Sequence, residues 1–391
     1  TACSRLYFGV IVNPGKGAVE SDCADRKSDK LSFGDWFMIK DIKISGFQLA
    51  LLIMGFLFGS TAVLNPTTIA GQDAWLAYIF GWLGGFLLIW LYVRIALINP
   101  SLTLVEILKK VFGKYFGTVL ALLYIWYFLH LAAIVLRDFG EHMNVTVYFK
   151  TPMVFTMGCF ALLIAYCLRK GLEVTGRAAE ILMPYLFVFL LVIFCLLLPE
   201  YDTDNLFPFL EKGLAPVIKA SLGVFTFPFG ESVAFLMIFP ALYSARQLKK
   251  VSFTAFLVMG FIIFGVIIRD LLSLGPDLLT RLVFPPSLST ELTPELQLEP
   301  LISVNLLLGG WVKITICLYA AVVGIAQLLN LDDYKPLVFP LVLFTVVLAR
   351  WLYDDIFKML DWALNVYPYY ALPLQVGIPL LILLIAKVRK L

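Results

Sequence analysis

Two charged residues, Glu231 and Lys313, lie deeper in apolar sequence than the other charged residues of the chain. An ionisable side chain in such surroundings is costly, and it usually faces a partner or a cavity. Glu231 is therefore a candidate for recognising an amine on a ligand, and the two residues together are candidates for an ion pair that latches two helices. In the alternative interpretation, each side chain is an anchor whose charged end reaches water.

Residues suited to catalysis or to cofactor binding do not form a recognisable motif. His130 and His142 are the only histidines and no two cysteines have CxxC spacing, so a structural zinc site is not expected. The chain has neither a Walker-type nor a GxGxxG loop for nucleotide phosphates, and no Ser/His/Asp set. We therefore predict that the protein is not an enzyme and has no metal or cofactor. We expect His130 to form an interhelical hydrogen bond rather than to relay protons.

The composition indicates a membrane protein with many spans. Of the 391 residues, 61% are hydrophobic and only 15% are charged, and the mean hydropathy is +0.91. Soluble domains contain about 45–50% apolar and roughly 25% charged residues, so a soluble protein is excluded. The net charge of +3 gives no support to nucleic-acid binding. Because a helix satisfies its own backbone groups in hydrocarbon, the expected fold is an all-α polytopic membrane protein embedded in the lipid bilayer.

Windows of about 19 residues predict ten transmembrane helices. Lysine and arginine are concentrated in alternate connections, and the loop 199–212 is acidic. Since positive charge favours the cytoplasmic side, we expect that loop outside and both termini in the cytoplasm. The expected spans are 46–64, 74–98, 117–137, 152–168, 179–198, 214–243, 251–274, 303–329, 336–353 and 368–388.

Two segments outside the spans have a character of their own. Residues 1–37 are polar with mixed charges, and we expect either a flexible cytosolic tail or a segment upstream of a natural start at Met38, so that the membrane domain covers 38–391. The segment 101–117 has apolar residues at helical spacing with lysines between them. That pattern predicts a short helix lying in the inner membrane interface, with a cytosolic helical loop as the alternative.

The first and sixth predicted spans are interrupted by glycine, proline and polar residues. Glycine weakens a helix and proline removes one of its hydrogen bonds, so both spans are expected to unwind near their middles. Unwound backbone in a membrane must face protein or a watery cavity, and the freed groups with the half-helix ends can bind a zwitterion or an ion. The candidate ligand-binding residues are Gly59, Ser60, Thr61, Phe227, Pro228, Gly230 and Glu231.

These two interrupted spans open the two halves of a ten-span chain. Paired interruptions at corresponding positions are typical of transporters built from repeats, whose binding site lies at the breaks. We therefore predict ten transmembrane helices in a 5+5 inverted repeat with broken helices 1 and 6. The alternative is that the interruptions are ordinary packing glycines and a proline kink, which are common in membrane helices.

Four segments along the chain resemble one known family. They are KISGFQLALL at the first span, LTLVEILKKVFGKYFGTVLALLY leading into the third, FPFGESVAFLMIFP at the sixth and GGWVKITICLYAAVVGIAQLL at the eighth. Together they resemble the spore germination protein B-subunit family, the permease-like membrane subunits of germinant receptors, within the amino acid–polyamine–organocation transporter superfamily. The resemblance covers residues 38–391. One departure is LISVNLLLGG at 301–310, where family members often carry an Arg/Glu-containing stretch.

The resemblance implies a sensor of small-molecule germinants that assembles with A and C subunits in the inner membrane of the spore. Three functions stay open: a receptor subunit that binds an amino acid, sugar or nucleoside and signals the start of germination, a secondary amino-acid transporter coupled to Na⁺ or H⁺, and a structural subunit with a vestigial cavity. The resemblance favours the receptor subunit. Flux in proteoliposomes would separate the transporter from the other two.

Overall fold

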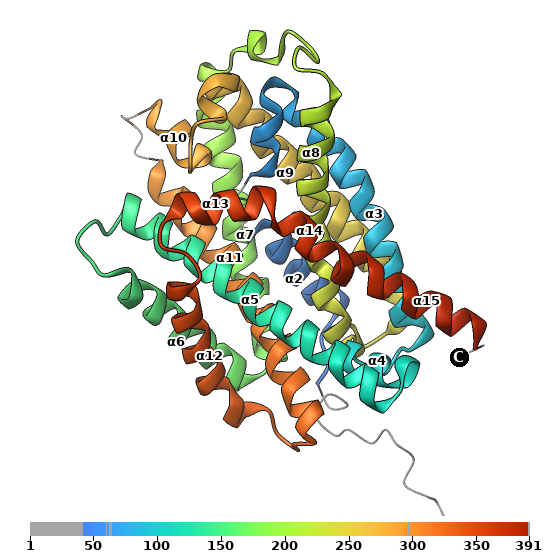
Figure 1. Ribbon diagram of the computed structural model, residues 1–391. Helices are drawn as coiled ribbons and strands as arrows, with labels where there is room; N and C mark the ends of the chain where they lie inside the picture. Colours follow the sequence, from blue (N-terminus) through green and yellow to red (C-terminus); the bar gives the residue numbers. More distant parts are fainter. Residues whose placement is uncertain (1–41, 60, 62–64, 294, 296–297, 390–391) are drawn as a thin grey trace, which may run out of the picture. The chain divides into compact units, whose positions relative to one another are not determined.

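The computed structural model describes residues 42–59, 61, 65–293, 295 and 298–389 (Figure 1). The predicted polar segment 1–37 and the candidate residue Ser60 lie outside the described residues. Within them the chain is nearly all helical, and its one β feature is an isolated parallel bridge between Ile44 and Leu242.

The helices follow one another with short connections. In chain order, the elements used below are α2 (Gly46–Phe58), the 3₁₀ helix η1 (Pro66–Asp73), α3 (Ala74–Ile98), α4 (Leu104–Phe112), α5 (Lys114–Thr146), α6 (Met153–Lys170), α7 (Leu172–Leu196), α8 (Leu214–Val224), the π-helical turn η4 (Phe225–Phe229), the 3₁₀ helix η5 (Gly230–Met237), α9 (Leu248–Leu279), α10 (Pro285–Glu291), α11 (Glu299–Leu329), α12 (Lys335–Trp351), α13 (Ile356–Asn365), α14 (Tyr367–Leu372), the π-helical turn η9 (Pro373–Gly377) and α15 (Ile378–Val388).

Eight helical segments of the described chain are long and apolar enough to cross a membrane. They become nine if α12 and α13, which are bent by 98° relative to each other, form one broken span. The sequence predicts ten spans, and the remaining one corresponds to α2. With 13 residues, α2 is about 20 Å long at 1.5 Å per residue, shorter than the roughly 30 Å of hydrocarbon.

The interior of the helical bundle is formed by α5 and α11, which pack along each other (Figure 1). The most apolar window of α11 is 83% buried by protein and that of α5 is 78% buried, whereas the value for α7 is 28%. A helix that is apolar on all sides must be surrounded by protein or by lipid. The central helices therefore form the core, and α7 belongs to the periphery.

The short helix α4 packs most of its apolar face against protein. A capping box between Thr103 and Glu106 begins it, as expected for a stable N-terminus. Most of its apolar side chains, including Leu104 and Leu108, are buried among α5, α11 and α15. The predicted helix is thus present, and protein covers most of its apolar side.

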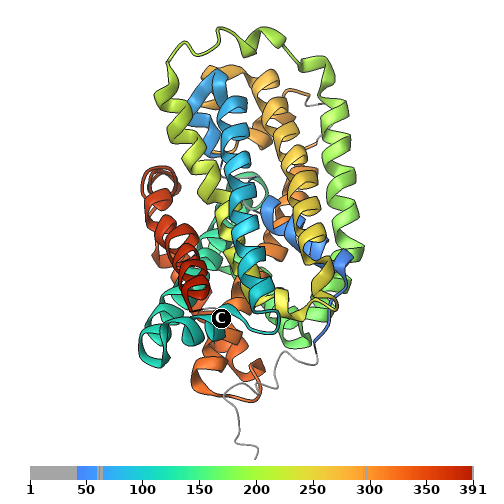
Figure 2. The same ribbon diagram turned by 90° about the vertical axis from the view of Figure 1, so that its right-hand side faces the viewer.

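Regular α-helical geometry is interrupted at both predicted breaks. Helix α2 ends at Phe58, and Asn65 caps the 3₁₀ helix that begins at Pro66. In the sixth span, α8 ends at Val224, and Phe227 has extended backbone angles (φ −136°, ψ 117°) within η4. The last span contains a third interruption, the π-helical turn η9, and α14 and α15 (red in Figure 2) continue on either side of it.

Candidate functional site

Glu231 and Lys313 form an ion pair in the interior. Glu231 lies in η5, directly after the break in the sixth span, whereas Lys313 lies in the first half of α11. The Lys313 ammonium contacts Glu231 Oε2, and both residues are fully buried. Since neither charge reaches the surface, the alternative interpretation as anchors that extend to water is excluded.

Side chains from three further elements also contact the ion pair. Lys313 Nζ lies 4.4 Å from the centre of the Phe227 ring and 5.4 Å from that of Phe56, close enough for cation–π attraction. The other carboxylate oxygen, Glu231 Oε1, accepts a hydrogen bond of 2.5 Å from the Tyr367 hydroxyl. The pair therefore joins η5 and α11 directly and contacts α2, η4 and α14.

Gln375 extends this polar network from the π-helical turn in the last span. Its Nε2 donates to the Tyr127 hydroxyl at 2.8 Å and to the Thr226 carbonyl oxygen at 2.9 Å. The Tyr127 and Tyr367 hydroxyl oxygens are 2.9 Å apart. Gln375 is fully buried, and it thus connects the breaks of the sixth and last spans.

Two tyrosines satisfy carbonyl groups at these interruptions. The Tyr92 hydroxyl lies 3.0 Å from the Gly230 carbonyl oxygen and 2.8 Å from that of Gln375. The Tyr124 hydroxyl donates to the Leu374 carbonyl oxygen at 2.5 Å. Backbone groups released by a broken helix need partners in a membrane, and here tyrosine side chains supply them.

Sequence reasoning did not identify Tyr92, Tyr367 or Gln375. One signal was available, because Pro373 and Gly377 bracket Gln375 inside the last predicted span. That is the same combination of proline and glycine that indicated the break in the sixth span.

Gly59 and Gly230 lie where elements approach each other closely. A Cβ atom added to Gly59 would be 2.6 Å from the Gly309 carbonyl oxygen and 2.6 Å from Lys313 Cβ. At Gly230 it would be 2.1 Å from Gln375 Oε1. All three distances are far below van der Waals contact, so at these two positions the structure supports the packing interpretation.

A small cavity of about 10 Å³ lies between the two breaks. Thr61 from the first break and Phe227 and Pro228 from the sixth line it, so three of the predicted site residues meet there. A volume of this size holds about one water molecule. The wall is completed by residues of the first break and of neighbouring helices: Asn65, Pro66, Tyr78, Val224, Ile263, Val266 and Ile267.

Two other buried polar residues on α5 lie outside this network. The His130 ring packs against the rings of Trp362 and Tyr370, with ring centres 5.2 and 5.6 Å away, and its Nδ1 has no hydrogen-bond partner among the described residues. At this nitrogen the predicted interhelical hydrogen bond is absent, and the contacts of the ring with Trp362 and Tyr370 are aromatic. Asp138 is also buried, and among the described residues its Oδ2 has no hydrogen-bond partner.

Comparisons of the sequence with known proteins agree on one family. The family model described as "Spore germination protein" matches residues 43–356. The chain is 33% identical over 360 residues to spore germination protein KB of Bacillus subtilis (strain 168), covering 89% of this chain and 95% of the relative. It is 29% identical over 337 residues to the putative spore germination protein YfkT of the same organism, covering 82% and 89%.

Comparisons with solved structures identify the fold. The chain superposes on MhsT, solved in complex with L-phenylalanine, with a TM-score of 0.58 at 17% identity, covering 87% of each chain. It superposes on Mhp1, a nucleobase-cation-symport-1 family transporter solved in a closed conformation with bromovinylhydantoin bound, with a TM-score of 0.63 at 14% identity, covering 88% of this chain and 78% of Mhp1. The helical arrangement is therefore similar to those of MhsT and of the transporter Mhp1.

Proposed function

The chain belongs to the spore germination protein family, and from this premise we propose that it is the membrane subunit of a germinant receptor. In this proposal it binds a small-molecule germinant (an amino acid, a sugar or a nucleoside) and signals the start of germination. Its partners are the A and C subunits of the receptor. It resides in the inner membrane of the spore with both termini in the cytoplasm, and its many apolar helices make it an integral membrane protein.

We also propose ten transmembrane helices in a 5+5 inverted repeat. In this arrangement α2 and η1 form the first span, with its break between them, and the segment from α8 through η5 forms the sixth. Two similarly interrupted spans at corresponding positions support the assignment. The TM-scores of 0.58 and 0.63 to transporters support it as well.

The observation that carries the function is the position of Phe227. Its side chain lines the cavity between the two breaks, and its ring lies 4.4 Å from the ammonium of the Glu231–Lys313 pair. Because the cavity has room for about one water molecule, a germinant must push the breaks apart to enter. Movement of Phe227 would then disturb the ion pair and convert binding into a movement of η5 against α11.

Filling the cavity tests this proposal. Ile267 lines the cavity and is 4% exposed, so Ile267→Trp should abolish both the germinant response of spores and the ligand-dependent thermal shift of the purified protein. The matched control is Ile181→Trp, because Ile181 on α7 is 66% exposed and the added ring would lie in lipid. A normal dose–response curve for Ile267→Trp at wild-type protein levels contradicts the proposal.

A milder change guards against misfolding of the tryptophan variant. Ile267→Val removes one methyl group and costs only about 0.5–1.5 kcal/mol of stability. One methylene in an apolar pocket changes discrimination by about ten-fold or more, so the germinant concentration for half-maximal response should change by roughly that factor. Ile181→Val should leave the response unchanged.

A secondary amino-acid transporter is the second candidate, because the fold is shared with two transporters. Uptake of a labelled germinant into proteoliposomes that contain the purified chain, driven by a Na⁺ or H⁺ gradient, would establish transport. Binding without uptake, together with loss of germination in cavity variants, favours the receptor. If cavity variants keep both ligand binding and germination at wild-type levels, a structural subunit is favoured.

A further inference from the structure

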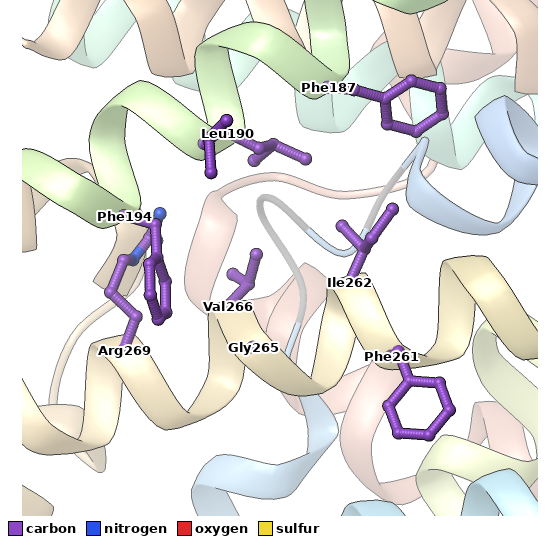
Figure 3. Close-up of a pocket in the computed structure, with 9 residues that line it drawn as sticks. Phe187, Leu190, Phe194, Phe261, Ile262, Gly265, Val266 and Arg269 are labelled. Carbon is purple, nitrogen blue, oxygen red and sulfur yellow. The ribbon is translucent and has the colours of Figure 1, made fainter.

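An apolar groove of about 280 Å³ lies between α7 and α9 (Figure 3). Phe187, Leu190 and Phe194 of α7 form one wall, and the other is formed by α9 around Gly265. In Figure 3, Phe194 and Arg269 lie near each other at one end. Helix α2 packs against both α7 and α9, so the groove is closed on its inner side by protein.

The groove opens toward the membrane. Leu191 and Phe261 at its rim are 63% and 58% exposed. The most apolar windows of α7 and α9 are only 28% and 39% buried by protein, and such apolar, exposed surfaces on membrane helices face hydrocarbon. The open side of the groove therefore faces the acyl chains of the surrounding lipids.

The size of the groove distinguishes among occupants. A helix with side chains is about 10 Å across, so a volume of 280 Å³ would be filled by less than one of its turns, about 5.4 Å. An acyl chain, whose carbon atoms make contact at about 4 Å, would fill the same volume over a length on the order of 15–20 Å. That length is comparable with the roughly 12 Å of α9 between Phe261 and Arg269. We propose that the groove binds one acyl chain of a bilayer phospholipid.

The charge at the end of the groove favours recognition of the lipid's acyl chain rather than of an anionic headgroup. Arg269 lines the groove, but its Nε and Nη2 both donate to Asp270 Oδ1, at 2.9 and 2.6 Å. Both residues are buried, so the guanidinium is already neutralised. The groove therefore selects a lipid by the fit of its hydrocarbon.

The bound acyl chain supports one wall of the small cavity between the two helix breaks, the candidate germinant site. Val266 lines the groove and also lines the small cavity between the two helix breaks. A chain in the groove packs on α9 from the membrane side at the position where α9 closes that cavity. This consequence rests on the proposed function, whereas binding of the acyl chain does not.

Gly265 provides a direct test, because a Cβ atom added there meets no protein atom within 4 Å. Gly265→Phe should therefore fill the groove without a clash inside the protein. Gly158 on α6 is the matched control, because it is also half-buried and its added Cβ also meets nothing within 4 Å. The probe is a phosphatidylglycerol with a photoreactive diazirine in its acyl chain, incorporated into vesicles that contain the full chain.

For the wild-type protein and Gly158→Phe, we expect crosslinks concentrated on the peptides that carry Phe187–Phe194 and Phe261–Arg269. Gly265→Phe should lose most of these crosslinks, and native mass spectrometry should find one retained lipid fewer. Equal crosslinking in all three proteins would overturn the proposal. Protein-to-protein crosslinks at these peptides in place of lipid adducts would overturn it too, because a second chain would then cover the groove.

If Gly265→Phe loses the lipid but keeps a normal germinant response, the acyl-chain site stands and its link to the germinant cavity fails. If Gly265→Phe keeps the lipid while Ile267→Trp abolishes the response, the acyl-chain site fails and the proposed function stands. The two proposals are thus tested by separate readouts.

Discussion

Among the residues that the structure describes, two fully buried ion pairs lie in different regions, and they differ in what they connect. Glu231 of η5 pairs with Lys313 of α11, so that pair joins elements distant in sequence. Arg269 and Asp270 are neighbours on α9, and Arg269 Nη2 lies 2.6 Å from Asp270 Oδ1. Both pairs carry the same charges and the same burial.

Burial removes both pairs from water, so both depend on their partners to offset the loss of hydration. The Arg269–Asp270 pair lies within one helix and moves with it, and its link to another element is a hydrogen bond of 3.3 Å from the Ser289 hydroxyl of α10 to Asp270 Oδ1. A pair between two elements must break when these elements separate. The comparison therefore predicts that breaking either pair destabilises the protein, whereas only Glu231 and Lys313 control a conformational change.

The largest effect is expected for Lys313→Met, which leaves the Glu231 carboxylate buried without its cation. The free energy of unfolding should fall by about 3–5 kcal/mol, measured by thermal unfolding of the purified protein, and the germinant response should be lost. The double variant Glu231→Gln, Lys313→Met should recover much of the stability, because no charge is left unpaired. Strictly additive effects in this double-mutant cycle would show that the two residues do not act as a pair.

A somewhat smaller loss is expected for Asp270→Asn. The amide oxygen of asparagine can still accept a hydrogen bond from Arg269, so the decrease in stability should lie near the lower end of the same range, about 3 kcal/mol. The germinant concentration for half-maximal response should stay at its wild-type value. A shifted dose–response curve at normal protein levels would remove the distinction between the two pairs.

Local sequence was sufficient to find the charged residues and the breaks of this region. Glu231 and Lys313 are each surrounded by apolar residues in the sequence. Pro228 and Gly230 interrupt an otherwise apolar helical segment. Each of these signals depends only on nearby residues. They indicated burial and unwinding, and both are present in the structure.

The rest of the site depends on contacts between distant parts of the chain. Tyr92 reaches the Gln375 carbonyl across 283 positions, and a tyrosine in a membrane span gives no sign of such a partner, because tyrosines are also common at interfaces. The local sequence likewise does not indicate the partners of Gly59 and of α4. Spacing identified a small residue and an apolar helix face, but only the tertiary structure shows what they contact.

A moderate effect is expected for Tyr92→Phe, which tests the polar network around the ion pair. The change removes the hydroxyl that lies near the Gly230 and Gln375 carbonyl oxygens and should lower stability by about 1–3 kcal/mol, the cost of a buried group that loses its partner. Tyr115→Phe is the control, since Tyr115 is 86% exposed, and it should have no effect. Equal unfolding temperatures of the two variants would argue against a structural role of the network.

The smallest effect is expected at an ion pair that is not buried at all. Lys358 Nζ donates to Asp354 Oδ2 at 2.5 Å, and this exposed hydrogen bond lowers the pKa of the Asp354 carboxyl below its usual value. A carboxylate whose pKa is lower in the folded state stabilises the fold above its unfolded pKa, and this contribution is lost as the pH falls through the folded pKa. Solvent screens such pairs, so Lys358→Ala should leave the unfolding temperature at pH 7 unchanged within error and should only weaken the decrease in stability on acidification. A decrease at pH 7 as large as that of Lys313→Met would show that burial is not what separates the strong pairs from the weak one.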